Sequence, residues 1–277
     1  MHKTIVQLQE LNQHLDDPDW IVVDCRYDLS DKSAGYRDYL NAHIPTAVYA
    51  DLHDDLSSSA MSNQGRHPLP APARLNQVFS SLGIHQHSQV VVYDSASASI
   101  AARLWWMLRY MGHEAVAILE GGWPVWQAAG YETEQTERKN SPAQFEGNVR
   151  RDWLVTTETV PDQALLVDSR EPARYRGELE PMDPVAGHIP GAINHYWRKN
   201  LDANGQFLAP QQIRQNFLDF YGATRPEEVV FYCGSGVTAC HNLLAAAHAG
   251  LAAARLYAGS WSDWCADPER PVATGDE

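Results

Sequence analysis

Cysteine is scarce in this sequence, and long hydrophobic runs are absent. Four of the 277 residues are cysteines, and no two of them form a Cys-x-x-Cys pair. This spacing argues against a disulfide scaffold and against a structural zinc site. No stretch approaches the ~18 apolar residues of a membrane-spanning helix, and the first residues lack the apolar core of a signal peptide. We therefore expect a cytoplasmic protein that uses no metal and no other cofactor.

Basic side chains are also in the minority. The chain has 21 lysines and arginines against 35 aspartates and glutamates, which gives a formal net charge of −14 at pH 7. Such a charge repels nucleic acid and anionic lipid, so neither nucleic acid nor a membrane is an expected partner. The length is large for one hydrophobic core and suits two domains of ~130 residues.

An internal repeat divides the sequence into two halves. Four short segments of the first half recur in the second half in the same order, which indicates two copies of one domain. We predict domains at residues 1–135 and 153–277, joined by a polar linker at residues 136–152. The matching segments are Val-Val-Asp-Cys-Arg (22–26) and Leu-Val-Asp-Ser-Arg (166–170), Ala-His-Ile-Pro (42–45) and Gly-His-Ile-Pro (187–190), Val-Val-Tyr-Asp-Ser (91–95) and Val-Phe-Tyr-Cys-Gly (230–234), and Gly-Gly-Trp (121–123) and Gly-Ser-Trp (259–261).

Short apolar runs alternate with helical patterns in each half. This alternation predicts an α/β fold in which each domain has a parallel sheet flanked by helices. In such sheets ligands bind beyond the carboxyl ends of the strands. A long loop at residues 52–72 of the first copy could reach across to the second. The expected strands are residues 21–23, 90–93, 116–119, 165–167, 229–232 and 254–257, and the expected helices are residues 101–111, 123–129, 210–221 and 237–249.

One cysteine lies at the carboxyl end of a predicted strand, directly before a glycine-rich turn and a helix. The backbone N–H groups of such a turn have no partners within the helix and form a concave nest for an anion. A thiolate is favoured there, so we predict that Cys233 is a nucleophile. The first copy has Asp94 at the equivalent strand end, and we expect that half only to assist. The turn consists of Gly234, Ser235, Gly236, Val237 and Thr238.

The other cysteines and several polar residues fit supporting roles. Cys240 follows Cys233 by about two helical turns, where it is either a resolving thiol or a small core residue. Cys25 and Cys265 are expected to be structural. Residues that occur in both copies, including the copy without a nucleophile, are more typical of scaffolding than of chemistry. These are His43 and His188, Asp24 and Arg26, and Asp168 and Arg170.

These motifs carry a family resemblance that covers nearly the whole chain. The strand-end Asp-x-Arg pairs, the two His-Ile-Pro segments and the loop Cys-Gly-Ser-Gly-Val-Thr at 233–238 resemble the tandem-domain rhodanese-type sulfurtransferases. The loop is similar to that of the 3-mercaptopyruvate branch, whereas the thiosulfate branch typically has Arg-Lys in place of Gly234 and Ser235. The resemblance implies two rhodanese-like domains, the second of them catalytic. It also implies transfer of sulfane sulfur from 3-mercaptopyruvate, through a persulfide on Cys233, to a thioredoxin-like or low-molecular-weight thiol or to cyanide.

The same resemblance implies roles for three further residues. Arg174 matches the arginine that holds the substrate's carboxylate, a task suited to a planar guanidinium. His67 matches the histidine of a Ser-His-Asp relay with the loop serine, Ser235. The acid of that relay falls at His53, so the relay is incomplete in this sequence. A second arginine of the mercaptopyruvate pattern is also missing, because Glu-Pro-Met-Asp occupies residues 180–183.

Three alternatives stay open. Thiosulfate sulfurtransferase is the nearest, although the uncharged Gly234 and Ser235 offer no pair of cations for a dianion. A phosphatase with this kind of loop needs an arginine at the sixth position after its cysteine, where this chain has Ala239. A sulfur-relay or interaction module would carry a persulfide on Cys233 without appreciable turnover.

Overall fold

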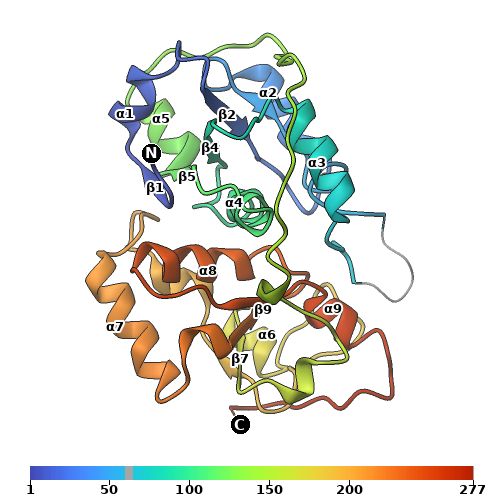
Figure 1. The fold of residues 1–277 in the computed structure, drawn as a ribbon. Coiled ribbons are helices and arrows are strands. Elements are labelled where there is room, and N and C mark those ends of the chain that lie inside the picture. Colours follow the sequence, from blue (N-terminus) through green and yellow to red (C-terminus); the bar gives the residue numbers. More distant parts are fainter. Residues whose placement is uncertain (60–64, 277) are drawn as a thin grey trace. The chain divides into compact units, whose positions relative to one another are not determined.

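The chain forms two compact units in the computed structural model, which describes residues 1–59 and 65–276 (Figure 1). Unit 1 consists of Met1–Ser58 and Pro70–Arg150, and unit 2 consists of Ser59–Leu69 and Arg151–Glu277. Among the described residues, no helix is both long and apolar enough to span a bilayer.

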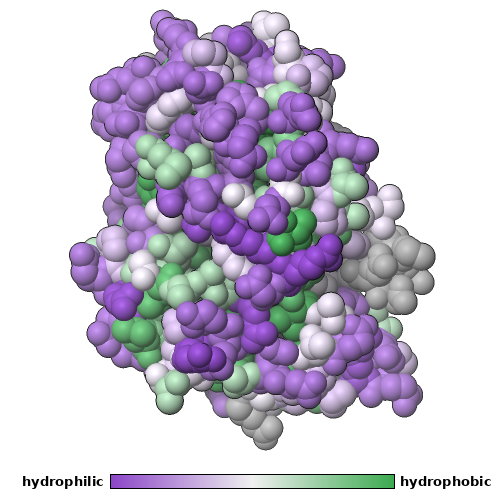
Figure 2. All heavy atoms as spheres, in the orientation of Figure 1, coloured by the Kyte–Doolittle hydropathy of each residue, from purple (hydrophilic) through white to green (hydrophobic). Residues whose placement is uncertain are grey.

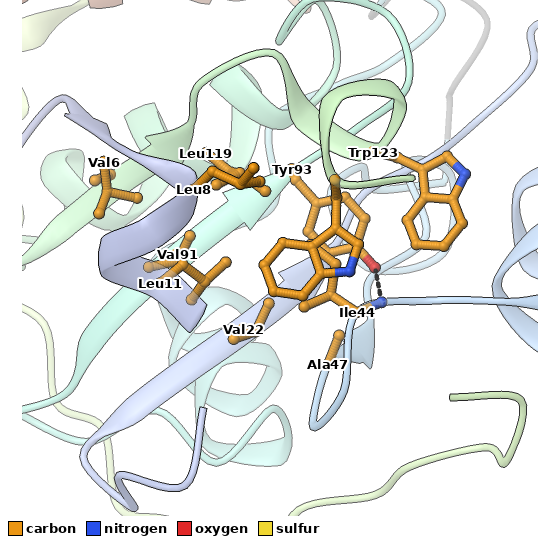
Figure 3. Close-up of a cluster of buried hydrophobic side chains, with 12 residues drawn as sticks. Val6, Leu8, Leu11, Val22, Ile44, Ala47, Val91, Tyr93, Leu119 and Trp123 are labelled. Carbon is orange, nitrogen blue, oxygen red and sulfur yellow. Dashed lines mark hydrogen bonds between the residues drawn. The ribbon is translucent and has the colours of Figure 1, made fainter. Parts of the chain in front are cut away.

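Unit 1 is built around a five-stranded parallel sheet. Its strands are β1 (Ile5–Val6), β2 (Trp20–Asp24), β3 (Val48–Tyr49), β4 (Gln89–Tyr93) and β5 (Val116–Leu119), and its helices are α1 (Leu8–Gln13), α2 (Ala34–Asn41), α3 (Pro72–Ser81), α4 (Ala101–Tyr110) and α5 (Gly122–Ala128). The strand order is β1-β5-β4-β2-β3. Side chains of α1 and α5 pack on one face of the sheet, as Figure 3 shows for Leu11 and Trp123 around Val22 and Tyr93. The residues that alternate with these along β4 are buried as well, so both faces of the sheet are covered.

Unit 2 repeats this sheet strand for strand. Its strands are β6 (Leu154–Val155), β7 (Leu165–Asp168), β8 (Ile193–Asn194), β9 (Val229–Tyr232) and β10 (Arg255–Tyr257), and its helices are α6 (Pro172–Tyr175), α7 (Pro210–Tyr221), α8 (Ala239–His248) and α9 (Ser260–Trp264), with 3₁₀ turns η1 (Arg151–Trp153), η2 (Val160–Asp162), η3 (Trp197–Asn200) and η4 (Pro226–Glu228). The order β6-β10-β9-β7-β8 is that of unit 1, and every pairing is parallel. Helix α8 packs against β9 and β10, and α7 packs against α8.

The predicted α/β architecture is confirmed, and every predicted strand and helix is present. The two-residue edge strands and the helices α1, α2, α3, α6 and α9 were not predicted. All of these except the ten-residue α3 are short elements, which leave little periodicity in a sequence. Helix α8 begins at Ala239, two residues later than predicted. The delay arises because Gly236 has φ +74° and the chain is still in the turn at Thr238.

Two connecting segments pack differently from simple loops. In the predicted linker, the amide of Asn148 donates to the carbonyl of Met111 at 2.8 Å, and the buried Phe145 lies edge-on to Phe79 with ring centres 5.1 Å apart. The linker therefore lies along unit 1 as far as residue 150. Part of the predicted loop at 52–72 falls at residues 60–64, outside the described residues, and its residues 65–69 belong to unit 2. The domain limits 1–135 and 153–277 themselves stay a prediction.

A buried polar core supports the carboxyl edge of both sheets. Arg26 forms an ion pair with Asp24 at 2.6 Å, and Arg170 forms the same pair with Asp168 at 2.7 Å. Each guanidinium also donates to a carbonyl just before the His-Ile-Pro segment. His43 and His188 are fully buried, and the Nδ1 of each lies at hydrogen-bond distance from a tyrosine carbonyl of its own unit. These contacts support the predicted scaffolding role of all six residues.

Candidate active site

Strand β9 carries Cys233 to the carboxyl edge of the sheet in unit 2. The thiol-bearing residue is 2% exposed. Its amide donates to the hydroxyl of Ser260 at 3.1 Å, and its carbonyl accepts a hydrogen bond from the amide of Trp261 at 3.0 Å. The carbonyl of Gly234 accepts from the amide of Ser262 in the same way at 2.9 Å. The first turn of α9 thus fixes the start of the reactive loop.

The loop after Cys233 is shaped for close backbone approach. Gly236 has φ +74°, and a Cβ atom at this position would lie 2.2 Å from the carbonyl oxygen of Ala258. Only glycine fits both constraints. In the part of the chain that the structure describes, the N–H groups of Ser235, Val237 and Thr238 donate to no protein acceptor. Unpaired N–H groups at a helix start are suited to bind an anion.

In unit 1 the equivalent loop binds an anion that belongs to the protein itself, the carboxylate of Asp94. The carboxylate of Asp94, at the end of β4, accepts four backbone hydrogen bonds of 2.8–2.9 Å from Ala96, Ala98, Ile100 and Ala101. Asp94 is 2% exposed. At the matching positions of unit 2, the N–H groups of Ser235 and Val237 donate to no acceptor among the described residues, and that of Cys240 donates to the carbonyl of Val237 at 3.1 Å. The comparison indicates that the second loop is built to hold a negative charge on the sulfur.

Ser235 and His67 meet, as the sequence analysis predicted. The hydroxyl oxygen of Ser235 lies 2.8 Å from Nδ1 of His67, and both residues are 8% exposed. His67 comes from residues 65–69, which belong to unit 2 although the chain around them belongs to unit 1. The predicted position of the relay acid, His53, lies in unit 1. There Asp51 accepts hydrogen bonds from the amides of His53 and Asp54 at 2.7 and 3.0 Å.

Arg174 on α6 is already paired with two acids. Its Nε and Nη2 atoms lie 3.2 and 2.7 Å from the carboxylate of Glu180, and Nη2 lies 3.2 Å from Asp183. Both acidic side chains are 3% exposed. The edge of the guanidinium formed by Nε and Nη2 is therefore occupied, and Nη1 is the nitrogen left for a substrate.

No motif in the sequence pointed to Arg66, whose guanidinium lies beside Gly234. Its Nη1 atom forms an ion pair with Asp183, and its amide donates to the hydroxyl of Ser262 at 3.1 Å. Burial lowers the pKa of the Arg66 guanidinium, and the positive charge of Arg174 lowers it further. The only available signal was its position next to His67, because nothing in the sequence brings residue 66 close to residue 234.

The remaining cysteines lie in less reactive surroundings. Burial raises the pKa of the Cys25 thiol well above its usual range, and burial also raises the pKa of the Cys265 thiol. Cys240 is fully buried, and its thiol donates to the carbonyl of Gly236 at 3.4 Å. This contact favours the core interpretation of Cys240 over a resolving thiol. All four cysteines are free, and no cluster among the described residues has the three ligands that a metal ion needs.

Comparison with known proteins gives the family. Residues 7–129 and 153–267 each match the model of the rhodanese-like domain. A Pseudomonas aeruginosa protein, provisionally named a 3-mercaptopyruvate sulfurtransferase, is 46% identical over 279 residues and 98% of each chain. A Mycobacterium tuberculosis protein, provisionally named a thiosulfate sulfurtransferase, is 39% identical over 92% of this chain and 90% of its own. The structure of 3-mercaptopyruvate sulfurtransferase from Leishmania major has a TM-score of 0.83 at 31% identity, and the match covers 94% of this chain and 73% of that one.

Both copies of the repeat match one family model, and the relatives span nearly the whole chain. The two sheets have the same strand order, with Asp94 directly after β4 and Cys233 directly after β9. The chain therefore belongs to the rhodanese-like family and consists of two tandem rhodanese-like domains.

Proposed function

We propose that this protein is a sulfurtransferase that takes sulfur from 3-mercaptopyruvate, carries it as a persulfide on Cys233 and passes it to a thiol or to cyanide. The observation that supports this most directly is the loop after Cys233, where the N–H groups of Ser235, Val237 and Thr238 donate to no acceptor among the described residues. In unit 1 the equivalents of Ser235 and Val237, which are Ala96 and Ala98, donate to the carboxylate of Asp94. The names of the relatives from Pseudomonas aeruginosa and Leishmania major agree with the proposed donor.

The proposed reaction has two displacement steps. The Cys233 thiolate attacks the sulfur of 3-mercaptopyruvate, so that an S–S bond forms and the C–S bond breaks. The electron pair of that bond leaves as the enolate of pyruvate, which takes up a proton. An acceptor thiolate or cyanide then attacks the outer sulfur and returns Cys233 as a thiolate. The loop N–H groups of Ser235, Val237 and Thr238 stabilise the anionic sulfur in both steps, as an oxyanion hole stabilises an alkoxide.

The polar residues around the loop take the remaining roles in the proposal. Gly234 and Gly236 allow the backbone to approach the donor closely, and Arg174 offers Nη1 to its carboxylate. Ser235 and His67, 2.8 Å apart, form a hydrogen-bonded pair that can deliver the proton to the enolate.

A specific observation favours thiosulfate as a second candidate donor. The sequence predicts no pair of cations at this loop, because Gly234 and Ser235 are uncharged. In the structure, the guanidinium groups of Arg66 and Arg174 both lie beside Gly234. Two cations suit a dianion, and the relative from Mycobacterium tuberculosis is provisionally named for thiosulfate. Acidic partners of both arginines reduce this preference, so 3-mercaptopyruvate stays the first choice.

The chemistry also indicates the compartment and the acceptors. The reaction needs Cys233 as a free thiolate, and all four cysteines are unpaired. Thiols persist in a reducing compartment, so we place the protein in the cytoplasm. A thioredoxin-like protein or a low-molecular-weight thiol is the acceptor that such a compartment provides, and cyanide is a convenient acceptor in the laboratory.

The proposal predicts that Cys233→Ser abolishes sulfur transfer and leaves the fold intact, because a hydroxyl at neutral pH does not replace a thiolate. Mass spectrometry after donor treatment should find one additional sulfur on the Cys233 peptide of the wild type. Cys240→Ser is the matched control and should retain activity. Sulfur found on the peptide of Cys25, Cys240 or Cys265 would contradict the proposal.

Steady-state rates with the two donors distinguish the candidate functions. We expect kcat/KM for 3-mercaptopyruvate to exceed that for thiosulfate by at least ~10-fold, because the acidic partners of both arginines leave too little net charge for a dianion. Equal or reversed values would make the protein a thiosulfate sulfurtransferase. A persulfide without turnover on either donor would instead identify a sulfur-relay module.

A further inference from the structure

Two guanidinium groups flank the residue that follows the nucleophile. A Cβ atom at Gly234 would lie 2.9 Å from Nη2 of Arg66 and 3.5 Å from Nη1 of Arg174. The two arginines come from distant parts of the sequence, one from the segment before His67 and the other from α6. Both belong to unit 2 and lie next to the residue that follows Cys233.

Two buried acids hold these arginines in place. One carboxylate oxygen of Asp183 pairs with Nη1 of Arg66, and the other lies 3.2 Å from Nη2 of Arg174. The carboxylate of Glu180 accepts hydrogen bonds from Nε and Nη2 of Arg174 and also lies 3.2 Å from Nη1 of Arg170. The acids thus occupy Nη1 of Arg66 and both Nε and Nη2 of Arg174, although Nη2 of Arg174 also lies 3.6 Å from the position of a Cβ atom at Gly234.

Three nitrogens of these two guanidinium groups have no protein acceptor among the described residues. They are Nε and Nη2 of Arg66 and Nη1 of Arg174, and Nε of Arg66 is buried. A buried N–H group without an acceptor is costly, and two guanidinium groups side by side repel each other. An anionic group placed between them would accept these hydrogen bonds and relieve the repulsion.

We propose that Arg66 is the second cation of the donor's anion site and, together with Asp183, a determinant of donor specificity. This inference rests on the proposed function and deepens it, because it assigns the anion end of the donor to a pair of arginines, Arg66 and Arg174. Residues 180–183 carry two acids and no arginine. The second positive charge is supplied instead by the segment that also carries His67.

Asp183 sets the net charge of this site. Three guanidinium groups, those of Arg66, Arg170 and Arg174, are balanced by the carboxylates of Asp168, Glu180 and Asp183. A formally neutral cluster with three free N–H donors suits the single carboxylate of 3-mercaptopyruvate. Removing the charge of Asp183 would leave a net positive site, which favours a dianion such as thiosulfate.

A binding experiment tests this inference without catalysis. In the full-length Cys233→Ser protein, isothermal titration calorimetry measures the Kd of thiosulfate. We expect Arg66→Met to weaken binding by at least ~10-fold and Asp183→Asn to strengthen it by ~3-fold or more. Arg66→Lys keeps the charge and should retain part of the affinity. The matched control is Arg176→Met, whose guanidinium pairs with Glu178 at the surface, and it should leave the Kd unchanged.

Kinetics of the active enzyme give a second readout. Arg66→Met should lower kcat/KM for both donors by ~10-fold or more, with a larger loss for thiosulfate. The discharge of preformed persulfide by dithiothreitol, an uncharged thiol, should change by less than ~2-fold. Asp183→Asn should shift the ratio of the two donors toward thiosulfate.

Several outcomes would overturn the inference. One is an unchanged thiosulfate Kd in Arg66→Met, and another is no measurable thiosulfate binding to the Cys233→Ser protein. A third is an equal loss of thiosulfate affinity in Arg66→Met and Asp183→Asn. If the ion pair between Arg66 and Asp183 only held residues 65–69 in place, either substitution would remove it and have the same effect. Failure of the proposed function would give a different experimental result. The wild type would then form no persulfide from either donor, while the difference in thiosulfate binding between the Arg66 variants would persist.

Discussion

At the scale of single residues, neighbouring charges decide what a side chain offers to a substrate. Arg174 was predicted to hold the carboxylate of the substrate, but the edge formed by its Nε and Nη2 atoms faces Glu180. No motif in the sequence pointed to Arg66, but its Nη2 atom lies 2.9 Å from the position of a Cβ atom at Gly234. The anion site therefore depends on both arginines and on the acids behind them.

His195 is a single residue whose burial should appear in the pH dependence of stability. It is 6% exposed in unit 2, and burial lowers its pKa to about 4. In the unfolded chain its pKa is ~6.5, so between these values the unfolded state binds a proton that the folded state does not. The free energy of unfolding should therefore fall by about 2 kcal/mol from pH 7 to pH 5 through this residue.

Urea unfolding of the wild type and of His195→Gln at both pH values measures this contribution. The variant should lose less stability than the wild type on acidification. His87→Gln, at an exposed histidine, is the control and should behave as the wild type does. An identical pH dependence in His195→Gln and the wild type would show that His195 is accessible to protons in the folded state.

At the scale of elements, the loop between a central strand and the following helix is used in two ways. In unit 1 the start of α4 is fixed by Asp94, whose carboxylate accepts from the amides of Ile100 and Ala101. In unit 2 the start of α8 follows Cys233 and has no such internal anion. The same backbone motif thus stabilises one unit and leaves a binding site in the other.

Asp94→Asn should destabilise unit 1 by about 2–4 kcal/mol, because an amide group presents its own N–H donors to backbone N–H groups. Thermal or urea unfolding measures this loss. Asp28→Asn is the control, since Asp28 is an exposed acid that caps a surface turn through Ser30, and it should leave the unfolding midpoint unchanged. Equal effects of the two substitutions would mean that the four hydrogen bonds of Asp94 contribute little.

At the scale of the whole molecule, acidic charge dominates. The formal net charge is −14, and hydrophilic residues cover most of the face shown in Figure 2. Anionic donors must approach a negative protein to reach the pair of arginines. Long-range repulsion of this kind is screened by salt, since the Debye length falls from ~30 Å at 0.01 M to ~8 Å at 0.15 M.

We therefore expect kcat/KM for thiosulfate to rise by roughly 2-fold or more between these ionic strengths, and that for the monoanion 3-mercaptopyruvate to rise less. Stopped-flow measurement of persulfide formation checks this. The dithiothreitol step is the control and should be insensitive to salt. A fall in the thiosulfate rate with salt would show that the local charge of Arg66 and Arg174 outweighs the net charge.

The sequence by itself determined the repeated domain and the parallel α/β architecture, and it pointed to Cys233 as the proposed nucleophile. Periodicity, glycine positions and the order of matching segments depend only on neighbours along the chain, so Cys233 and its loop could be found without coordinates. The pairing of Ser235 with His67 followed from a family resemblance, and the 2.8 Å between Oγ and Nδ1 agrees with it.

Only the tertiary structure decided how charge is arranged around that loop. Arg66 and Asp183 are far apart in the sequence, and their ion pair exists because residues 65–69 pack within unit 2. The occupied edge of Arg174 and the buried carboxylate of Asp94 are likewise products of packing. Electrostatic interactions depend on distance and burial rather than on spacing along the chain, which is why the specificity of the site was not readable from the sequence.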